Sequence, residues 1–231
     1  MDSKSFENAL RNDIEDVFTS ILSECNFLLS ISARSRSGAE ISDYLEDAFV
    51  LYMEQNKHTR ISNSQSAPKD KTKNPYDIKF EYTYSDHSIE IKNELIWADI
   101  KASKKSYADS NPDIGTPTKV INFLKKGHFY LIYVMFEYIA TENNETQFVK
   151  LDNDKYVKVI FLKNIHRSVR VNPKPQLQVN FKMPEEYRTK KEFIDLLETK
   201  YYESLDRITK NVANKRVSLK DDFDEIRNLY K

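Results

Sequence analysis

The chain has 231 residues, a mass of 27.2 kDa, and 36 basic against 36 acidic residues, so its formal net charge is zero. A single cysteine excludes a disulfide framework and a thiolate zinc cluster, and the four scattered histidines lack metal-ligand spacing. Three glycines are too few for a glycine-rich phosphate loop or a dinucleotide fingerprint. No apolar run approaches the ~20 residues of a membrane helix, and the polar N-terminus does not look like a signal peptide. We therefore expect a cytoplasmic globular protein with an ordinary core.

The first third of the chain predicts two helices and a loop. Apolar residues at three- and four-residue steps indicate one helix over residues 4–29 and, after a polar break at 31–37, a second from Ala39 to Gln55. Residues 56–74 are rich in Ser, Asn and Lys and predict a loop.

The middle of the chain predicts a sheet. Alternating apolar residues indicate a strand over 78–84, and after a turn at 85–88 a second strand becomes continuously apolar near 95–98, as in the middle of a sheet. Thr116 and Pro117 predict a helix start, and Gly127 its end. Two further strands are expected over 128–139 and 156–162.

The C-terminal part predicts a basic loop and two helices. Three prolines indicate that 164–187 is mostly loop, with a short strand over 177–181, and helices follow over 189–210 and 218–230. Residues 158–191 carry nine basic and two acidic residues, which is typical either of a nucleic-acid-binding face or of an ordinary solvated one. The whole chain predicts a mixed α/β fold with a central mixed β-sheet flanked by helices.

Two aspartates and a lysine lie at the ends of the two strands that form the expected hairpin. Asp77 opens the first strand, and Asp99 and Lys101 close the second, where residues two apart project from the same face about 7 Å from each other. Charged groups beside a buried apolar strand are costly to desolvate, and a cation between the aspartates would offset that cost. Magnesium prefers such carboxylates together with water and substrate phosphate, and Lys101 would add positive charge beside that phosphate.

Glu40 is the candidate third carboxylate. It lies in the first turn of the second helix, on one face with Asp43, Tyr44 and Asp47. A first-turn acid also has a purely structural interpretation, because it complements the helix dipole. Glu46 and Asp47 are expected to be solvated surface residues.

The order helix, strand, strand, helix, strand, with acids at the strand ends, resembles the PD-(D/E)xK nuclease superfamily. Pro75-Tyr76-Asp77 resembles the first part of its motif, with one additional residue, and Asp99-Ile100-Lys101 the second, with Asp in place of the commoner Glu. The stretches 38–46, 73–75, 109–117 and 172–176 more narrowly resemble type II restriction endonucleases of the SwaI kind.

This resemblance implies magnesium-dependent hydrolysis of double-stranded DNA at a palindromic, A·T-rich site, leaving 5′-phosphate and 3′-hydroxyl ends. It implies that Asp77, Asp99 and Glu40 hold Mg²⁺ and that Lys101 stabilises charge at the phosphate. A palindrome has a two-fold axis, so a homodimer with one active site per subunit is the simplest assembly.

Candidate DNA contacts fall into two groups. Basic loop residues near the acids are candidates for phosphates: Arg34, Arg36, Lys69, Lys71 and Lys73. Amide and basic residues of the 170–180 segment are candidates for bases: Arg170, Asn172, Lys174, Gln176, Gln178 and Asn180. The alternation of Gln176, Gln178 and Asn180 favours one strand face, which is equally typical of a polar sheet edge.

We expect one restriction-endonuclease-like domain over 1–231, and two other functions remain open. The domain would comprise a helical part (1–56), a catalytic sheet core (76–163), a DNA-recognition region (164–187) and C-terminal helices (188–231). One alternative is a structure-specific or repair nuclease of the same superfamily. The other is a non-catalytic nucleic-acid-binding module, in which Asp77, Asp99 and Lys101 are only structural.

Overall fold

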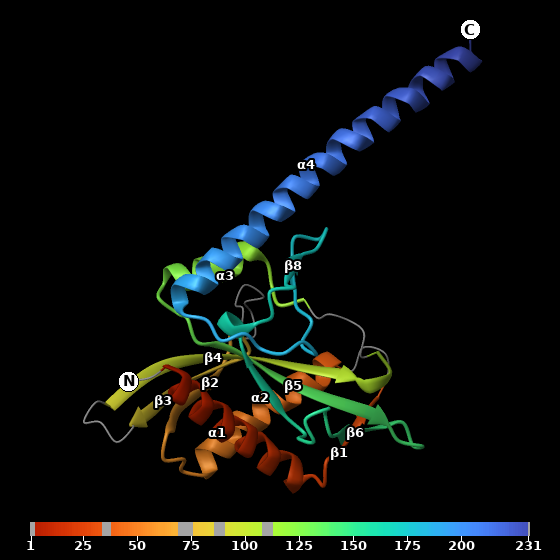
Figure 1. The fold of residues 1–231 in the computed structure, drawn as a ribbon. Helices are drawn as coiled ribbons and strands as arrows, with labels where there is room; N and C mark the ends of the chain where they lie inside the picture. Colours follow the sequence, from red (N-terminus) through yellow and green to blue (C-terminus); the bar gives the residue numbers. More distant parts are fainter. Residues whose placement is uncertain (1–2, 34–37, 69–75, 86–90, 108–112, 231) are drawn as a thin grey trace.

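A seven-stranded mixed sheet forms the centre of the protein (Figure 1). The structure is a computed structural model and describes residues 3–33, 38–68, 76–85, 91–107 and 113–230. The strand order is β1-β6-β5-β4-β3-β2, and β7 pairs with the first part of β5 while β6 pairs with its last part. The strands are β1 (Leu28–Ser32), β2 (Ile61–Ser66), β3 (Ile78–Ser85), β4 (Ile91–Lys104), β5 (Leu131–Ala140), β6 (Glu145–Val149) and β7 (Lys158–Phe161).

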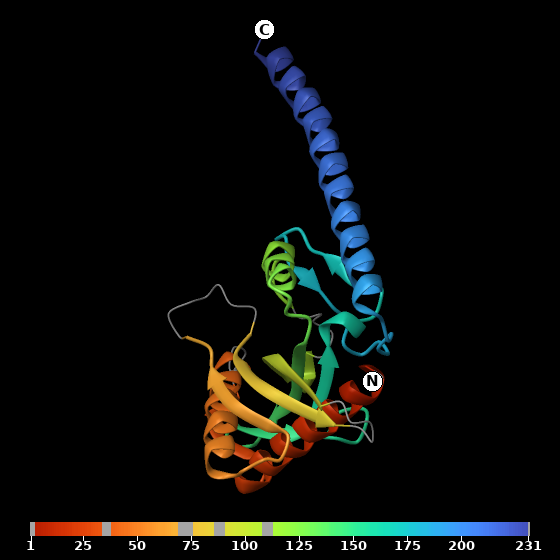
Figure 2. The ribbon, with the colours of Figure 1, turned by 90° about the vertical axis from the view of Figure 1, so that its left-hand side faces the viewer.

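Different elements cover the two faces of this sheet (Figures 1 and 2). Helices α1 and α2 pack on one face, where Phe18 of α1 lies 5.1 Å from Phe49 of α2 and 5.3 Å from Phe136 of β5 between ring centroids. The other face carries a second apolar cluster built from α3, the hairpin β8–β9 and the first turns of α4. The remaining elements are α1 (Ser3–Glu24), α2 (Gly38–Gln55), η1 (Lys105–Tyr107), α3 (Pro117–Lys125), η2 (Leu162–Asn164), β8 (Arg170–Val171), β9 (Leu177–Gln178) and α4 (Lys190–Leu229).

Strand β4 lies between these two apolar clusters. Its residues from 96 to 100 are all buried, because Ile96, Ala98 and Ile100 face α1 and α2 while Trp97 faces α3. It pairs antiparallel with β3 and parallel with β5, and α3 makes the crossover that a parallel pair requires. The apolar run near 95–98 thus forms an inner strand, as predicted.

Helix α2 approaches β4 closely at its N-terminus. A Cβ atom built on Gly38 would lie 2.6 Å from the backbone oxygen of Ala102, so only glycine fits there. One turn later, Ser42 Oγ donates a hydrogen bond to the backbone oxygen of Ile100 (3.2 Å). These contacts fix the distance between the helix and the end of β4.

Buried charges join α1 to the segment that follows β7. Lys163 and Glu7 are each 2% exposed and form an ion pair of 2.7 Å. Asn164 donates to Glu7 (2.7 Å) and accepts a hydrogen bond from the backbone NH of Arg188 (3.1 Å). Since each charge has a partner, this network anchors the chain just before α4.

The structure confirms the predicted fold class and several of the predicted helices and strands. The mixed sheet flanked by helices is present, and α2, β3, β4, β5 and β7 lie where patterning placed them. Thr116 caps α3 by accepting a hydrogen bond from the NH of Lys119 (3.3 Å), and Gly127 follows the helix with a φ of 82°. The expected turn at 85–88 lies mostly outside the described residues.

Four predictions of secondary structure are wrong at specific places. Helix α1 ends at Glu24, because Asn26 and Phe27 adopt positive φ values of 52° and 59° and turn the chain into β1. The polar strand β2 occupies part of the expected loop, since it pairs with β3, and β6 likewise escaped prediction. The two expected C-terminal helices form one helix of 40 residues, since neither glycine nor proline interrupts residues 211–217.

Gly38→Ala is expected to destabilise the protein by about 1–3 kcal/mol, because the added methyl group must displace the β4 backbone or α2. Thermal unfolding measures the change, and Ala39→Ser, at the exposed neighbouring position, is the control. Equal melting temperatures for Gly38→Ala and wild type would contradict the close approach.

Candidate active site

Asp77 lies at the point where β3 begins, directly beside β4. Its backbone NH donates to the oxygen of Ala98 (2.8 Å), and its Oδ2 accepts a hydrogen bond from the NH of Ile100 (2.7 Å). Asp77 is therefore bound to both residues that flank Asp99, through its backbone NH to Ala98 and through its carboxylate to Ile100. Both backbone contacts depend on the β3–β4 register, in which Ile78 pairs with Ala98.

Asp99 and Lys101 form an ion pair on the same face of β4. Lys101 Nζ lies 2.7 Å from Asp99 Oδ1, and the side chains are 30% and 11% exposed, respectively. Burial raises the pKa of Asp99 to about 7, and the charge of Asp77 and its hydrogen bond add to this increase, whereas Lys101 opposes it. Asp77 therefore lies close enough to Asp99 for its charge to disfavour ionisation of the Asp99 carboxyl.

Tyr133 packs beside this pair from β5. It is the register partner of Asp99 in the parallel β4–β5 ladder and is fully buried. Burial, followed by the charges of Asp99 and Asp77, raises the pKa of its phenol far above the ordinary value. Its hydroxyl donates to the backbone oxygen of Ile114 (3.4 Å), which connects the acidic site to the segment before α3.

On helix α2, Glu46 is half-buried and lies close enough to Asp77 for their charges to interact, whereas Glu40 is exposed. Glu40 shares with Asp43 and Asp47 an exposed face of the helix, because it lies two residues, or about 200°, from Ser42, which faces β4. Glu46 lies one turn beyond Ser42 on the same side. The expectation that it is solvated is wrong: it is half-buried, and burial together with the charge of Asp77 raises its pKa to about 7. Helical periodicity counted from Ser42 would have identified Glu46, but only after its contact with β4 was known.

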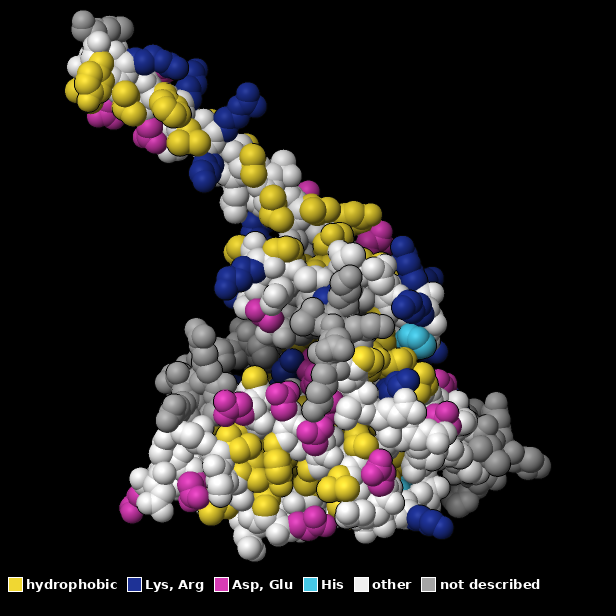
Figure 3. Space-filling view, turned by 180° about the vertical axis from the view of Figure 1, so that it is seen from behind, with side chains coloured by type: hydrophobic (Ala, Val, Ile, Leu, Met, Phe, Trp, Pro, Cys, Tyr) yellow, Lys and Arg dark blue, Asp and Glu magenta, His cyan; other side chains and the backbone are white. Residues whose placement is uncertain are grey.

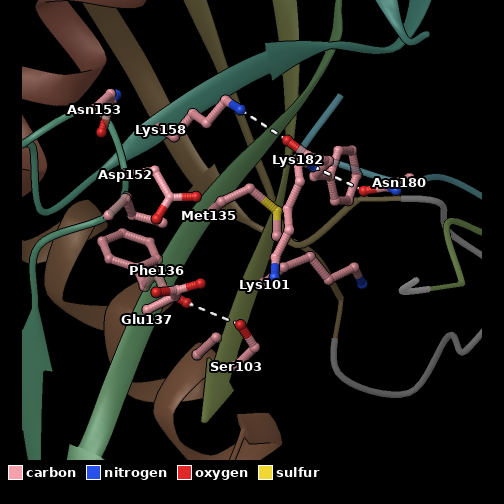
Figure 4. Close-up of a pocket in the computed structure, with 13 residues that line it drawn as sticks. Lys101, Ser103, Met135, Phe136, Glu137, Asp152, Asn153, Lys158, Asn180 and Lys182 are labelled. Carbon is pink, nitrogen blue, oxygen red and sulfur yellow. Dashed lines mark hydrogen bonds between the residues drawn. The ribbon is translucent and has the colours of Figure 1, made fainter. Parts of the chain in front are cut away.

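A pocket of about 410 Å³ adjoins the carboxyl-terminal ends of β4 and β5 (Figure 4). Lys101 lines it from β4, and Glu137 lines it from β5. Lys158 also lines it and donates to the backbone oxygen of Phe181 (2.7 Å), while Asn180 accepts from the NH of Lys182 (3.0 Å). The volume lies in the range of small-ligand sites, and the lining is rich in hydrogen-bonding groups.

The predicted base-reading segment forms the hairpin β8–β9, and its members differ in exposure. Arg170 and Lys174 are exposed, while Gln176, Gln178 and Asn180 are half-buried and alternate with buried Leu177 and Val179. Arg170 Nε donates to Gln178 Oε1 (3.3 Å) across the hairpin.

Asn172 has a structural place instead. It is 8% exposed, donates to Asp113 (2.9 Å) and accepts from the NH groups of Lys174 (2.9 Å) and Gln176 (3.0 Å). Its amide therefore closes the hairpin loop, and the geometry does not favour the predicted contact between Asn172 and a base.

The basic charges of residues 158–191 do not all form one exposed face. Lys163 and Arg188 are buried, and Arg167 pairs with Glu186 at 2.8 Å. Ion pairing within the protein thus uses part of the predicted positive charge. The phosphate-contact candidates lie outside the described residues: Arg34, Arg36, Lys69, Lys71 and Lys73.

The donor set of Asp77 and Asp99 fits a hard divalent cation. Two neighbouring carboxylates, one of them buried with a raised pKa, carry negative charge that a cation would stabilise. In the described part of the chain, no three His, Cys, Asp or Glu side chains gather closely enough to hold a metal ion. Magnesium characteristically binds through one or two carboxylates, with water and phosphate completing its octahedron.

Comparison with known proteins identifies the class as the restriction endonucleases. The family model that matches is SwaI-like, described as SwaI restriction endonuclease, and it matches residues 2–220. Because this match spans nearly the whole chain, the protein belongs to the SwaI-like restriction endonuclease family, and DNA is its substrate.

Among solved structures, the restriction endonuclease NlaIV is similar at 13% sequence identity, over 81% of this chain and 79% of that chain, with a TM-score of 0.49. Among curated proteins no significant match is found. The family assignment therefore rests on the family model alone. None of the described helices is long and apolar enough to cross a membrane.

Asp99→Asn is expected to raise the melting temperature relative to wild type by an amount that grows from pH 4 to pH 7. The folded pKa of about 7 lies above the ordinary 3.8, so the folded state binds the proton more tightly and wild-type stability falls as pH rises through this window. The effect is a few kcal/mol at most.

Thermal unfolding without divalent cations across this pH range measures the difference. Asp195→Asn, at an exposed position on α4, provides the baseline. A difference that shrinks as pH rises would contradict the buried acid.

Proposed function

We propose that this restriction endonuclease is a type II enzyme that hydrolyses both strands of duplex DNA at a palindromic, A·T-rich site with Mg²⁺. The carrying observation is the convergence of Asp77, Asp99 and Lys101 at the β3–β4 junction, with Asp77 hydrogen-bonded to the NH of Ile100. Family membership supports nuclease activity and argues against a non-catalytic binding module. The predicted cytoplasmic location remains an expectation.

Each of these side chains has a role in phosphodiester hydrolysis. Asp77 and Asp99 would hold Mg²⁺, which supplies Lewis-acid stabilisation of phosphate oxygens and lowers the pKa of water when bound. Lys101, half-exposed toward the pocket, would place positive charge where negative charge builds up on the phosphate. Water adds to phosphorus and the 3′ oxygen leaves with the bonding electrons, which yields 5′-phosphate and 3′-hydroxyl ends.

The hairpin β8–β9 is the proposed sequence reader. Gln176, Gln178 and Asn180 present amides on the polar side of this segment, and amides pair bidentately with adenine. Arg170 and Lys174 are the exposed basic side chains of the hairpin that would contact DNA. A palindromic site further favours a two-fold symmetric homodimer.

Lys101→Met and Asp77→Asn are each expected to reduce cleavage at least ~100-fold while leaving DNA binding largely intact. The first removes positive charge beside the reacting phosphate, and the second removes a carboxylate that would hold Mg²⁺. Plasmid and bacteriophage DNA are incubated with and without Mg²⁺, the ends are sequenced, and binding is measured by mobility shift. Lys105→Met, an exposed lysine just beyond β4, is the control.

Discrete fragments with defined ends would support the type II proposal. A smear would instead indicate a structure-specific or repair nuclease of the same superfamily. Full cleavage by Lys101→Met or by Asp77→Asn would overturn the assigned site.

Glu46→Gln is expected to lower cleavage by about tenfold or more, because it removes a carboxylate whose charge acts on Asp77. Glu40→Gln, on the exposed face of the same helix, is the matched control and is expected to retain near wild-type cleavage. The two initial rates at saturating Mg²⁺ decide between these carboxylates. A larger loss for Glu40→Gln would restore Glu40 as the third acid.

A further inference from the structure

Helix α4 leaves the body of the protein and continues alone. Phe193 and Leu197 anchor its first turns in the second apolar cluster, and Ser204 is its last buried residue. Every residue from 205 to 230 is exposed, although Arg207 still contacts the backbone oxygen of Val171 in β8. These 26 residues project about 39 Å from the body (Figures 1 and 2).

An apolar stripe with a period of seven runs along the projecting part. Leu205, Val212, Leu219 and Ile226 repeat through four successive heptads and are 44%, 62%, 44% and 48% exposed. A second heptad position lies three residues after the first, and there Ile208 and Leu229 extend the stripe. Figure 3 shows apolar side chains gathered along this helix.

This pattern is typical of a helix that pairs with another helix. Apolar residues at every seventh position, with a second set three residues later, form the seam of a coiled coil. Most helical stability in proteins comes from packing of the apolar face, and this face has no covering element among the described residues.

We propose that the stripe of α4 binds the same stripe of a second copy of this chain, with the two helices antiparallel. This inference deepens the two-fold assembly proposed above by naming its contact surface. A two-fold axis requires one patch that is complementary to itself.

Two charged residues within the stripe determine the orientation. Lys215 and Asp222 occupy the second heptad position, about 10.5 Å apart along one helix, which is too far for an ion pair. In a parallel, in-register pair each would meet its own copy, and like charges would face each other. In an antiparallel pair centred near Val217, Lys215 lies opposite the partner's Leu219 and within about 5 Å along the axis of the partner's Asp222.

The flanking charges favour the same orientation. Residues 207–220 contain five basic and no acidic residues, and residues 221–227 contain four acidic and one basic residue. Antiparallel packing lays the basic part of one helix along the acidic part of the other, whereas parallel packing aligns like charges. Polar residues in a seam and charges beside it set orientation and partner choice.

Val212→Glu and Val217→Glu make a matched pair of variants. Both valines are 62% exposed, but Val212 belongs to the stripe and Val217 lies about 140° away around the helix. Sedimentation velocity over a range of concentrations is expected to show a dimer for wild type and Val217→Glu. Dimerisation of Val212→Glu is expected to be weaker by at least tenfold, since it places a charge in the apolar seam.

Charge exchange tests the orientation. Lys215→Asp and Asp222→Lys are each expected to weaken the dimer several-fold, and the double variant to restore it. A parallel dimer would instead leave association unchanged in Lys215→Asp, because one like-charged pair would replace another. Circular dichroism checks that helix content is retained in every variant.

A monomeric wild-type protein, or equal association of Val212→Glu and Val217→Glu, would overturn the proposal. A Val212→Glu variant that stays dimeric but binds DNA more weakly would also overturn it and would assign the stripe to DNA. Sedimentation measures association independently of DNA cleavage. A monomeric protein that cuts DNA would therefore overturn the proposed α4 contact but not the proposed nuclease site. If the wild-type protein forms a dimer that Val212→Glu weakens, but does not cut DNA, the proposed nuclease site is overturned and the α4 contact stands.

Discussion

The hydrogen bond from the NH of Ile100 to the Asp77 carboxylate is the contact on which the candidate site depends. It joins the start of β3 to the end of β4 and holds one acid beside another that is buried. Neighbouring carboxylates in a low-dielectric site repel each other, so the arrangement is costly without protons or a cation. The fold tolerates this cost because Ile96, Ala98 and Ile100 bury β4 against α1 and α2. The apolar face thus stabilises the strand whose polar face would bind the metal.

Hydrogen bonds also connect the site to the β8–β9 hairpin, which we propose reads DNA. Tyr133 pairs with Asp99 in the sheet and donates through its hydroxyl to Ile114. The NH of Ile114 in turn donates to the backbone oxygen of Leu177 in β9 (2.8 Å). A displacement of the hairpin on bound DNA would therefore act on the strand beside Asp99 through two hydrogen bonds.

Sequence patterns succeeded where local chemistry decides the structure. Thr116 and Gly127 determine both ends of α3, and the alternating residues of β3 determine its buried face. The D-x-K spacing placed Asp99 and Lys101 on one face, since a strand has a period of two. Local patterns could not decide the third acid, because a first-turn position such as that of Glu40 says nothing of which helix face meets the sheet. Gly38 and Ser42 set that face through contacts with residues about 60 positions away.

By itself, then, the sequence determined the mixed α/β class, the inner strands and the pairing of Asp99 with Lys101, because those features follow from hydropathy and from periods of two and 3.6 residues. Only the tertiary structure decided that β1, β2 and β6 are strands, since β1 continues a run with helical periodicity, β2 and β6 are largely polar, and each becomes a strand by pairing with its neighbours in the sheet. It likewise decided that Asn172 closes a loop, that Glu46 is half-buried, and that α4 projects from the body. These properties depend on long-range contacts and burial, which no local pattern contains.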